Sequence, residues 1–142
     1  MVGPYGYCAD ISRTFVCGND FNNNQKELYS ISLDQINHNA NLIKAEMSFR
    51  EFIEKSWKLP EEYYGNRYSV MVHGIGLCDE WPSIRYPTDG GDKSGRFLKN
   101  MTITVESYIG KVGGKEGVKL EQQYLVGERG LELMSHHPLE DI

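Results

Sequence analysis

Four ligating side chains stand out because each lies in, or at the end of, a short run of strand-forming residues. They are Asp10, His73, Glu106 and Glu121. The period of two along a strand puts the apolar neighbours on one face and the ligating side chain on the other. If these strands adjoin, three carboxylates and one imidazole share a cleft, where they would repel one another unless a cation neutralised them. The residues alone leave open the ordinary alternative, in which each glutamate faces water and the histidine has no ligand role.

A site rich in carboxylates, with one histidine, restricts the choice of metal. Oxygen and imidazole nitrogen donors together suit a divalent transition metal such as Fe, Zn or Mn. Carboxylates that bridge two ions suit a two-metal site. If these residues hold a metal, we therefore expect a divalent transition metal as cofactor.

The elements that must position these residues follow from the hydropathy period and from capping and turn residues. In chain order we expect a strand at 5–18, helices at 24–47 and 48–59, and strands at 68–73, 101–108 and 117–126. A long loop rich in Gly, Pro and Asp covers residues 74–100. The order β, α, α, β, β, β predicts an α+β fold, with helices over a curved, mostly antiparallel sheet.

Composition narrows the class of protein. A chain of 142 residues is one domain's worth, and its net charge of −5 without a run of Lys or Arg argues against nucleic acid or an anionic membrane as partner. The sequence has no apolar run near the roughly 20 residues of a membrane-spanning helix, and its first residues do not resemble a signal peptide. Cys8, Cys17 and Cys78 lack a regular spacing and indicate reduced thiols in a cytoplasmic protein.

Four motifs resemble, in the same order, those of the creatinase, aminopeptidase P and methionine aminopeptidase superfamily. The family patterns are Asp-x-Ser-Arg-Thr, His-Gly-x-Gly, Thr-x-Glu-Pro-Gly-x-Tyr and Gly-Val-Arg-Leu-Glu. Their counterparts here are Asp10-Ile11-Ser12-Arg13-Thr14, His73-Gly74-Ile75-Gly76, Thr104-Val105-Glu106 followed by Tyr108, and Gly117-Val118-Lys119-Leu120-Glu121. The resemblance implies the pita-bread fold of that family, with two metals in its cleft.

The resemblance also implies which residue holds which metal. The equivalents of Asp10, His73, Glu106 and Glu121 hold one ion, while the second ion shares Asp10 and Glu121 and needs another aspartate about ten residues earlier. That aspartate would precede Met1. We therefore expect residues 1–142 to be the C-terminal portion of the catalytic domain, without an N-terminal domain and without the start of the catalytic domain, and the full-length protein to be a homodimer.

One departure from the peptidases concerns the residues after His73. The peptidases of the family place a second histidine there, which helps to stabilise the tetrahedral intermediate. This chain reads Cys78-Asp79-Glu80-Trp81-Pro82, with Asp79 in place of that histidine. A carboxylate at this place would repel a developing oxyanion but is suited to accept a proton as a general base.

Residues 3–10 and 73–82 together resemble one branch of the superfamily, the dimethylsulfoniopropionate lyases. The resemblance implies cleavage of this small molecule to dimethyl sulfide and acrylate, with Asp79 as the catalytic base and with Tyr68 and His73 contacting the substrate. Strict alternation would put Tyr68 and His73 on opposite faces, so a bulge is needed between them. The alternatives are a Xaa-Pro aminopeptidase or dipeptidase and, from another class, a catalytically silent binding module on the same fold.

Overall fold

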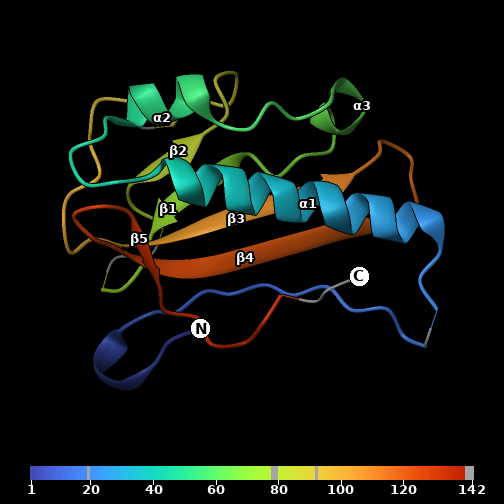
Figure 1. Ribbon diagram of the computed structural model, residues 1–142, viewed down its shortest axis with the longest axis horizontal. Coiled ribbons are helices and arrows are strands. Elements are labelled where there is room, and N and C mark those ends of the chain that lie inside the picture. The colour runs from blue at the N-terminus through green and yellow to red at the C-terminus, as the bar shows by residue number, and fades with distance from the viewer. Residues whose placement is uncertain (19, 78–79, 92, 140–142) are drawn as a thin grey trace.

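The computed structural model describes residues 1–18, 20–77, 80–91 and 93–139 as helices packed on an antiparallel sheet (Figure 1). Within these residues the sheet has five strands in the order β2-β1-β3-β4-β5, and every neighbouring pair is antiparallel. The elements are η1 (Pro4–Gly6), α1 (Asn23–Leu42), α2 (Phe49–Lys55), α3 (Glu61–Tyr64), β1 (Val70–Gly74), β2 (Ser83–Arg85), β3 (Thr102–Gly110), β4 (Gly117–Val126) and β5 (Leu131–Leu133). The predicted α+β class with an antiparallel sheet is confirmed.

Helix α1 begins at a capping box. The Asn22 side chain accepts a hydrogen bond from the Gln25 backbone N–H, and the Gln25 side chain accepts one from the Asn22 backbone N–H. This reciprocal pair satisfies two of the backbone donors that every helix start leaves free. The helix then lies across β3 and β4 (Figure 1), with Leu28, Tyr29 and Ile36 buried in the core.

The helix is shorter than its apolar stripe predicts. It ends at Leu42 rather than at Met47, because Ile43 already has an extended backbone, with φ of −76° and ψ of 129°. The chain then turns at Glu46, which has φ of 69° and whose N–H donates to the carbonyl of Phe97. Ile43 and Met47 continue the stripe and are buried without being helical. Helix α2 begins after Ser48 as predicted, because the Ser48 hydroxyl accepts from the Glu51 N–H. It ends at Lys55, however, and not at residue 59 as predicted.

The two faces of the sheet differ in polarity, as strand alternation requires. The face toward α1 carries buried apolar side chains, among them Ile103, Val105 and Leu120. Ser107 belongs to this face, because its hydroxyl donates to the Gln35 Oε1 atom of α1 at 2.6 Å. Its neighbour Glu106 therefore points to the opposite face, away from the helix.

The predicted strand at 5–18 is wrong as a regular element. Tyr5 and Gly6 lie in η1, and the rest of the segment forms no strand; among the described residues, its one backbone bridge to the sheet joins Ser12 and Glu121. The reason lies at Thr14, whose hydroxyl accepts from the Lys119 backbone N–H and donates to the Lys119 carbonyl. A side chain thus takes the place of the next ladder hydrogen bonds. Strands β2 and β5 and helix α3 were not predicted, since three or four residues carry too little periodicity.

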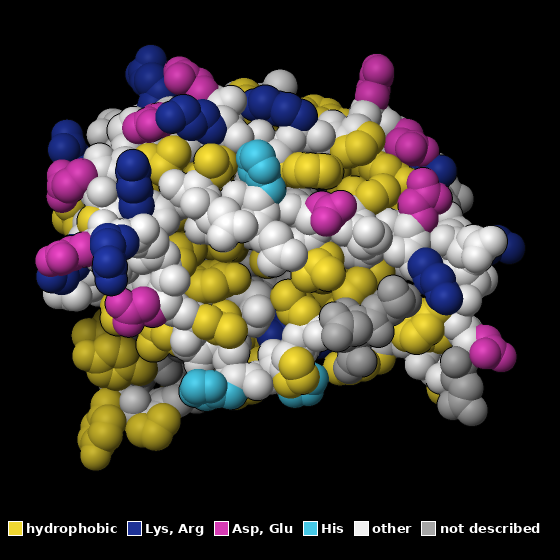
Figure 2. Space-filling model, in the orientation of Figure 1, with side chains coloured by type: hydrophobic (Ala, Val, Ile, Leu, Met, Phe, Trp, Pro, Cys, Tyr) yellow, Lys and Arg dark blue, Asp and Glu magenta, His cyan; other side chains and the backbone are white. Residues whose placement is uncertain are grey.

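The surface is mixed in charge. Acidic and basic side chains are interspersed over the face drawn in Figure 2, and hydrophobic side chains gather where the N-terminal loop protrudes. Tyr5 on that loop is 96% exposed. In the described part of the chain, no helix combines the length and the hydropathy that crossing a membrane would require.

The first strand after the helices shows two special features. β1 and β2 pair with a register shift between Val70 and Val72, which is the bulge that the sequence required between Tyr68 and His73. At the end of β1, Gly74 lies so close to Trp81 that a Cβ atom would stand 2.0 Å from the Trp81 carbonyl oxygen. No side chain fits there, which explains the glycine of the His-Gly pair.

We expect Gly74→Ala to lower the free energy of unfolding by about 2 kcal/mol or more, because the added methyl forces the backbone of residues 81 and 82 away. Urea unfolding of the 142-residue chain measures this. The matched control is Gly130→Ala, where an added Cβ meets no atom within 4 Å. Equal unfolding midpoints for the two variants would contradict the packing argument.

Candidate metal centre

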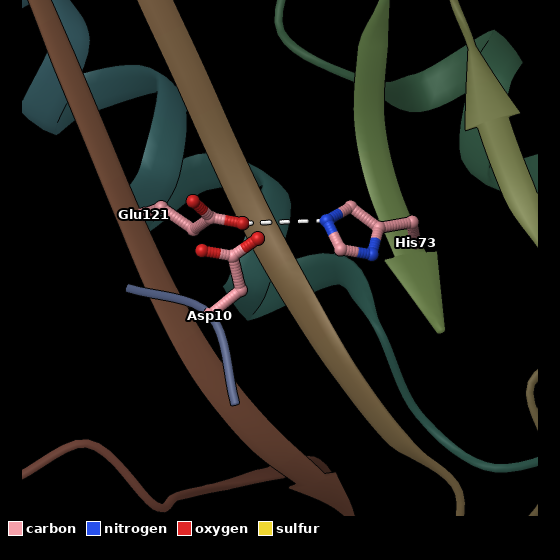
Figure 3. Close-up of side chains that lie close together, drawn as sticks. All are labelled: Asp10, His73 and Glu121. Carbon is pink, nitrogen blue, oxygen red and sulfur yellow. Dashed lines mark hydrogen bonds and ion pairs between the residues drawn. The ribbon is translucent and has the colours of Figure 1, made fainter. Parts of the chain in front are cut away.

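Three of the four predicted ligands meet on the face of the sheet opposite α1 (Figure 3). Asp10 comes from the N-terminal segment, His73 from β1 and Glu121 from β4. Each offers one ligand atom, and these atoms lie within 4.8 Å of one another. Two ligands on opposite sides of an ion with bonds of ~2.1 Å stand about 4.2 Å apart, so the group is close to a coordinating arrangement.

The fourth predicted ligand adjoins this group. Glu106 on β3 is the direct cross-strand partner of Glu121, and its Oε1 atom is 3.7 Å from His73 Nε2. His73 Nε2 is 3.3 Å from Glu121 Oε1. The three residues are almost fully buried, with exposures of 2% for His73, 1% for Glu106 and 0% for Glu121. Buried carboxylates of this kind need a positive partner.

The imidazole is already oriented for a metal. His73 Nδ1 lies 2.9 Å from the Gly74 carbonyl oxygen, a contact in which the ring N–H donates to that oxygen. When the ring is neutral, this hydrogen bond leaves the lone pair on Nε2, which faces the carboxylates (Figure 3). Ligating histidines are commonly held by such a bond on their other nitrogen.

The electrostatics of the metal-free cluster show a shortage of positive charge. Burial and the neighbouring charge of Glu121 raise the pKa of Glu106 to about 7, against the opposing effects of Lys119 and His73. Burial alone would lower the pKa of His73, but its hydrogen bonds to Glu121 and Gly74 and the charge of Glu106 raise it to about 9. The cluster therefore takes up a proton at His73.

The two carboxylate oxygens of Glu106 are poorly satisfied. Among the described residues, neither Oε1 nor Oε2 has a directed hydrogen bond, although the Lys119 ammonium forms an ion pair with Oε2 at 2.9 Å. Buried carboxylate oxygens left in this state are costly in an apo protein and are natural ligand atoms for a cation. Together with the orientation of His73, they make this residue set fit a divalent metal.

Ser12 and Arg13 support the cluster, although their motif gave them no stated role. The Ser12 hydroxyl donates to Glu121 Oε2 at 3.0 Å. Arg13 donates to the backbone carbonyls of Ser12, Glu121 and Pro138, and to the side chain of Gln122. It thereby fastens the N-terminal segment to β4 beside the ligand. The sequence could have indicated both residues, because they follow the predicted ligand Asp10 by two and three positions.

Lys119 is the other residue that sequence reasoning missed. It lies two positions before Glu121 on β4, so alternation puts it on the same face as the cluster. Its ammonium stands 4.6 Å above the centre of the Tyr68 ring. The predicted substrate contact Tyr68 thus reaches this face, through the bulge in β1, and is 39% exposed.

The predicted catalytic base, Asp79, lies outside the described residues. The described residues on either side of it place both ends of its loop at the cluster. Gly74 follows His73 directly, and Ser83, where the chain returns, pairs with His73 in the β1–β2 ladder.

The sequence profile of metallopeptidase family M24 matches residues 1–128. Among individual proteins, dimethylsulfoniopropionate lyase DddP of Roseovarius nubinhibens is 33% identical over 99% of this chain and 32% of its own length. The Xaa-Pro dipeptidase of Pyrococcus furiosus is also 33% identical, over 91% of this chain and 36% of its own length. The chain thus spans about a third of the length of these relatives.

Solved structures show the same architecture. A Xaa-Pro dipeptidase from Bacillus anthracis matches 94% of this chain and 37% of its own with a TM-score of 0.73 and 32% identity. The prolidase of Pyrococcus horikoshii matches 96% of this chain and 38% of its own with a TM-score of 0.76 and 26% identity. The pita-bread fold expected from the motifs is confirmed.

We expect Mn²⁺ or Zn²⁺ to raise the melting temperature of the 142-residue chain, because an ion that binds only the folded state stabilises it. Glu121→Gln should abolish most of this rise, since it removes a ligand charge at the centre of the cluster. The control is Glu128→Gln, an exposed carboxylate paired with Lys99 on the surface. Metal shifts of the same size in both variants would place the binding site elsewhere.

Ser12→Ala tests the support of Glu121. Loss of its hydroxyl leaves every ligand in place but frees one carboxylate oxygen to rotate, so we expect metal affinity to fall by roughly tenfold or more. Isothermal titration with Mn²⁺ measures the change. An unchanged affinity would show that the hydrogen bond does not position the ligand.

Proposed function

Because this chain belongs to metallopeptidase family M24, we propose that it forms the metal-binding part of a lyase that cleaves dimethylsulfoniopropionate to dimethyl sulfide and acrylate. The observation that carries the proposal is the carboxylate-rich cluster combined with Asp79 in place of the peptidase histidine. The match to the lyase of Roseovarius nubinhibens, which extends over 99% of the chain, supports it.

We assign Asp10, His73, Glu106 and Glu121 as the ligands of a divalent transition metal. When bound, the ion supplies Lewis acidity to the carboxylate of the substrate, which acidifies the adjacent C–H bond. His73 is suited to its role because the Gly74 carbonyl fixes the ring, and Glu121 because the Ser12 hydroxyl fixes one of its oxygens.

The bond changes in the proposed elimination balance without any further reactant. Asp79 takes the proton from the carbon next to the carboxylate, and the electron pair of that C–H bond forms the C=C bond of acrylate. The C–S bond breaks with its electrons passing to sulfur, so the sulfonium leaves as neutral dimethyl sulfide. The general base contributes most if its carboxylate is ionised at the working pH.

The structure restricts how the sulfonium group of the substrate could bind to Tyr68. One face of the Tyr68 ring already carries the Lys119 ammonium. A sulfonium bound to Tyr68 by cation–π attraction must use the other face of the ring or follow the departure of Lys119, since two cations on one face repel.

A Xaa-Pro peptidase is the second candidate, and a specific observation favours it. The dipeptidase of Pyrococcus furiosus has the same 33% identity as the lyase of Roseovarius nubinhibens, although over 91% rather than 99% of this chain. Both activities would use the same metal cluster. What separates them is the residue that acts beside the metal, a proton acceptor in the elimination and a donor to the oxyanion in peptide hydrolysis.

We expect the full-length, metal-loaded protein to release dimethyl sulfide from dimethylsulfoniopropionate, detected by headspace gas chromatography, and to leave a Xaa-Pro dipeptide intact. Asp79→Asn should lower kcat by roughly 100-fold or more, the usual contribution of a general base. Glu80→Gln, which changes the next carboxylate along the chain, is the matched control and should retain activity. Cleavage of the dipeptide without dimethyl sulfide would identify a peptidase instead.

A further inference from the structure

The strands place Lys119 diagonally across from Glu106 and two positions before Glu121 on the same face. Its direct partner on β3 is Tyr108, whereas Glu106 is the direct partner of Glu121. Residues diagonal to one another across two strands are within reach of a long side chain. The Lys119 ammonium accordingly lies 2.9 Å from Glu106 Oε2 and 3.7 Å from Glu121 Oε2.

The glutamate pair cannot stand alone without a cation. Like charges directly opposite on adjacent strands destabilise a sheet, and both of these side chains are about 1% exposed. Removing the positive partner of a buried charge is strongly destabilising. In the metal-free protein this neutralisation comes from His73 and Lys119.

These two cations differ in how easily they can leave. His73 is buried and tied to the Gly74 carbonyl, so it stays in place and can become a ligand by losing its proton. Lys119 has a side chain that is 37% exposed and a flexible stem, so its ammonium can swing out to water. The resembled family motif has arginine at this position, a rigid fork that would hold both oxygens of one carboxylate more firmly.

We propose that Lys119 is a built-in placeholder for the metal, an ammonium that neutralises Glu106 and Glu121 in the metal-free protein and is displaced when a divalent cation binds. The inference rests on the metal-binding part of the proposed function but not on the lyase reaction. It means that part of the affinity for metal is used to displace Lys119. Lysine at this position therefore lowers metal affinity and keeps the empty site folded.

Lys119→Met tests the proposal through stability and binding, without an activity assay. The variant should melt at a lower temperature than wild type without metal and at the same temperature when saturated with Mn²⁺, because the lysine contributes only to the metal-free state. Isothermal titration with Mn²⁺ should give about tenfold tighter binding, as expected for the loss of one partly buried neighbouring charge. Lys119→Gln provides a second neutral variant should Lys119→Met fold poorly.

Two controls separate displacement from other effects. Lys119→Arg keeps the charge and should melt no lower than wild type without metal. Lys99→Met removes a lysine whose partner, Glu128, is on the surface, and should change neither melting nor Mn²⁺ affinity.

The remaining outcomes would overturn the inference. Equal losses of melting temperature with and without Mn²⁺ would mean that Lys119 is structural in both states. An unchanged melting temperature without metal would mean that it neutralises nothing. Wild type that binds Mn²⁺ as tightly as both neutral variants would reject the placeholder alone, whereas no Mn²⁺ binding by any of the proteins would reject the metal centre and the placeholder together.

Discussion

Two glutamates facing each other across a pair of central strands, both nearly inaccessible to water, dictate much of the rest of this structure. Glu106 and Glu121 form a direct cross-strand pair in the β3–β4 ladder. Burial of two such charges is unfavourable unless cations surround them. His73 lies on one side of the pair, Lys119 reaches in from the open side, and the Ser12 hydroxyl donates to the remaining oxygen of Glu121. The same need for positive charge makes the site suitable for a divalent metal.

The scaffold meets this need by separating its two faces. Helix α1 covers the apolar face of β3 and β4, so the charged side chains lie on the opposite face (Figure 1). Ser107, where the family pattern has proline, strengthens the division, because it donates to the buried Gln35 of α1, which in turn donates to Tyr86. A polar link on the helix side thus fixes the strand next to a ligand without adding charge to the core.

The lyase and peptidase alternatives share this scaffold and differ in one neighbour of the metal. A carboxylate beside the site favours the removal of a proton, whereas hydrolysis of an amide needs a donor for the oxyanion. Lys119 adds a second constraint, because its ammonium occupies one face of the Tyr68 ring in the metal-free protein. Under the proposed lyase function, binding of the metal and access of a cationic substrate to that ring would therefore be coupled through the same side chain.

The sequence by itself determined the features that depend on near neighbours in the chain. Alternation placed Glu106 and Glu121 on a polar face, the capping residue Ser48 marked the start of α2, and β4 was predicted with its observed bounds of Gly117–Val126. Only the tertiary structure decided the features that depend on distant partners. Thr14 replaces ladder hydrogen bonds of Lys119, so the predicted first strand does not form, and the Phe97 carbonyl helps to turn the chain at Glu46, after α1 has ended. Ser12 meets Glu121 across 109 residues of sequence. Such contacts leave no local period, because their free energy comes from a partner that the nearby sequence does not contain.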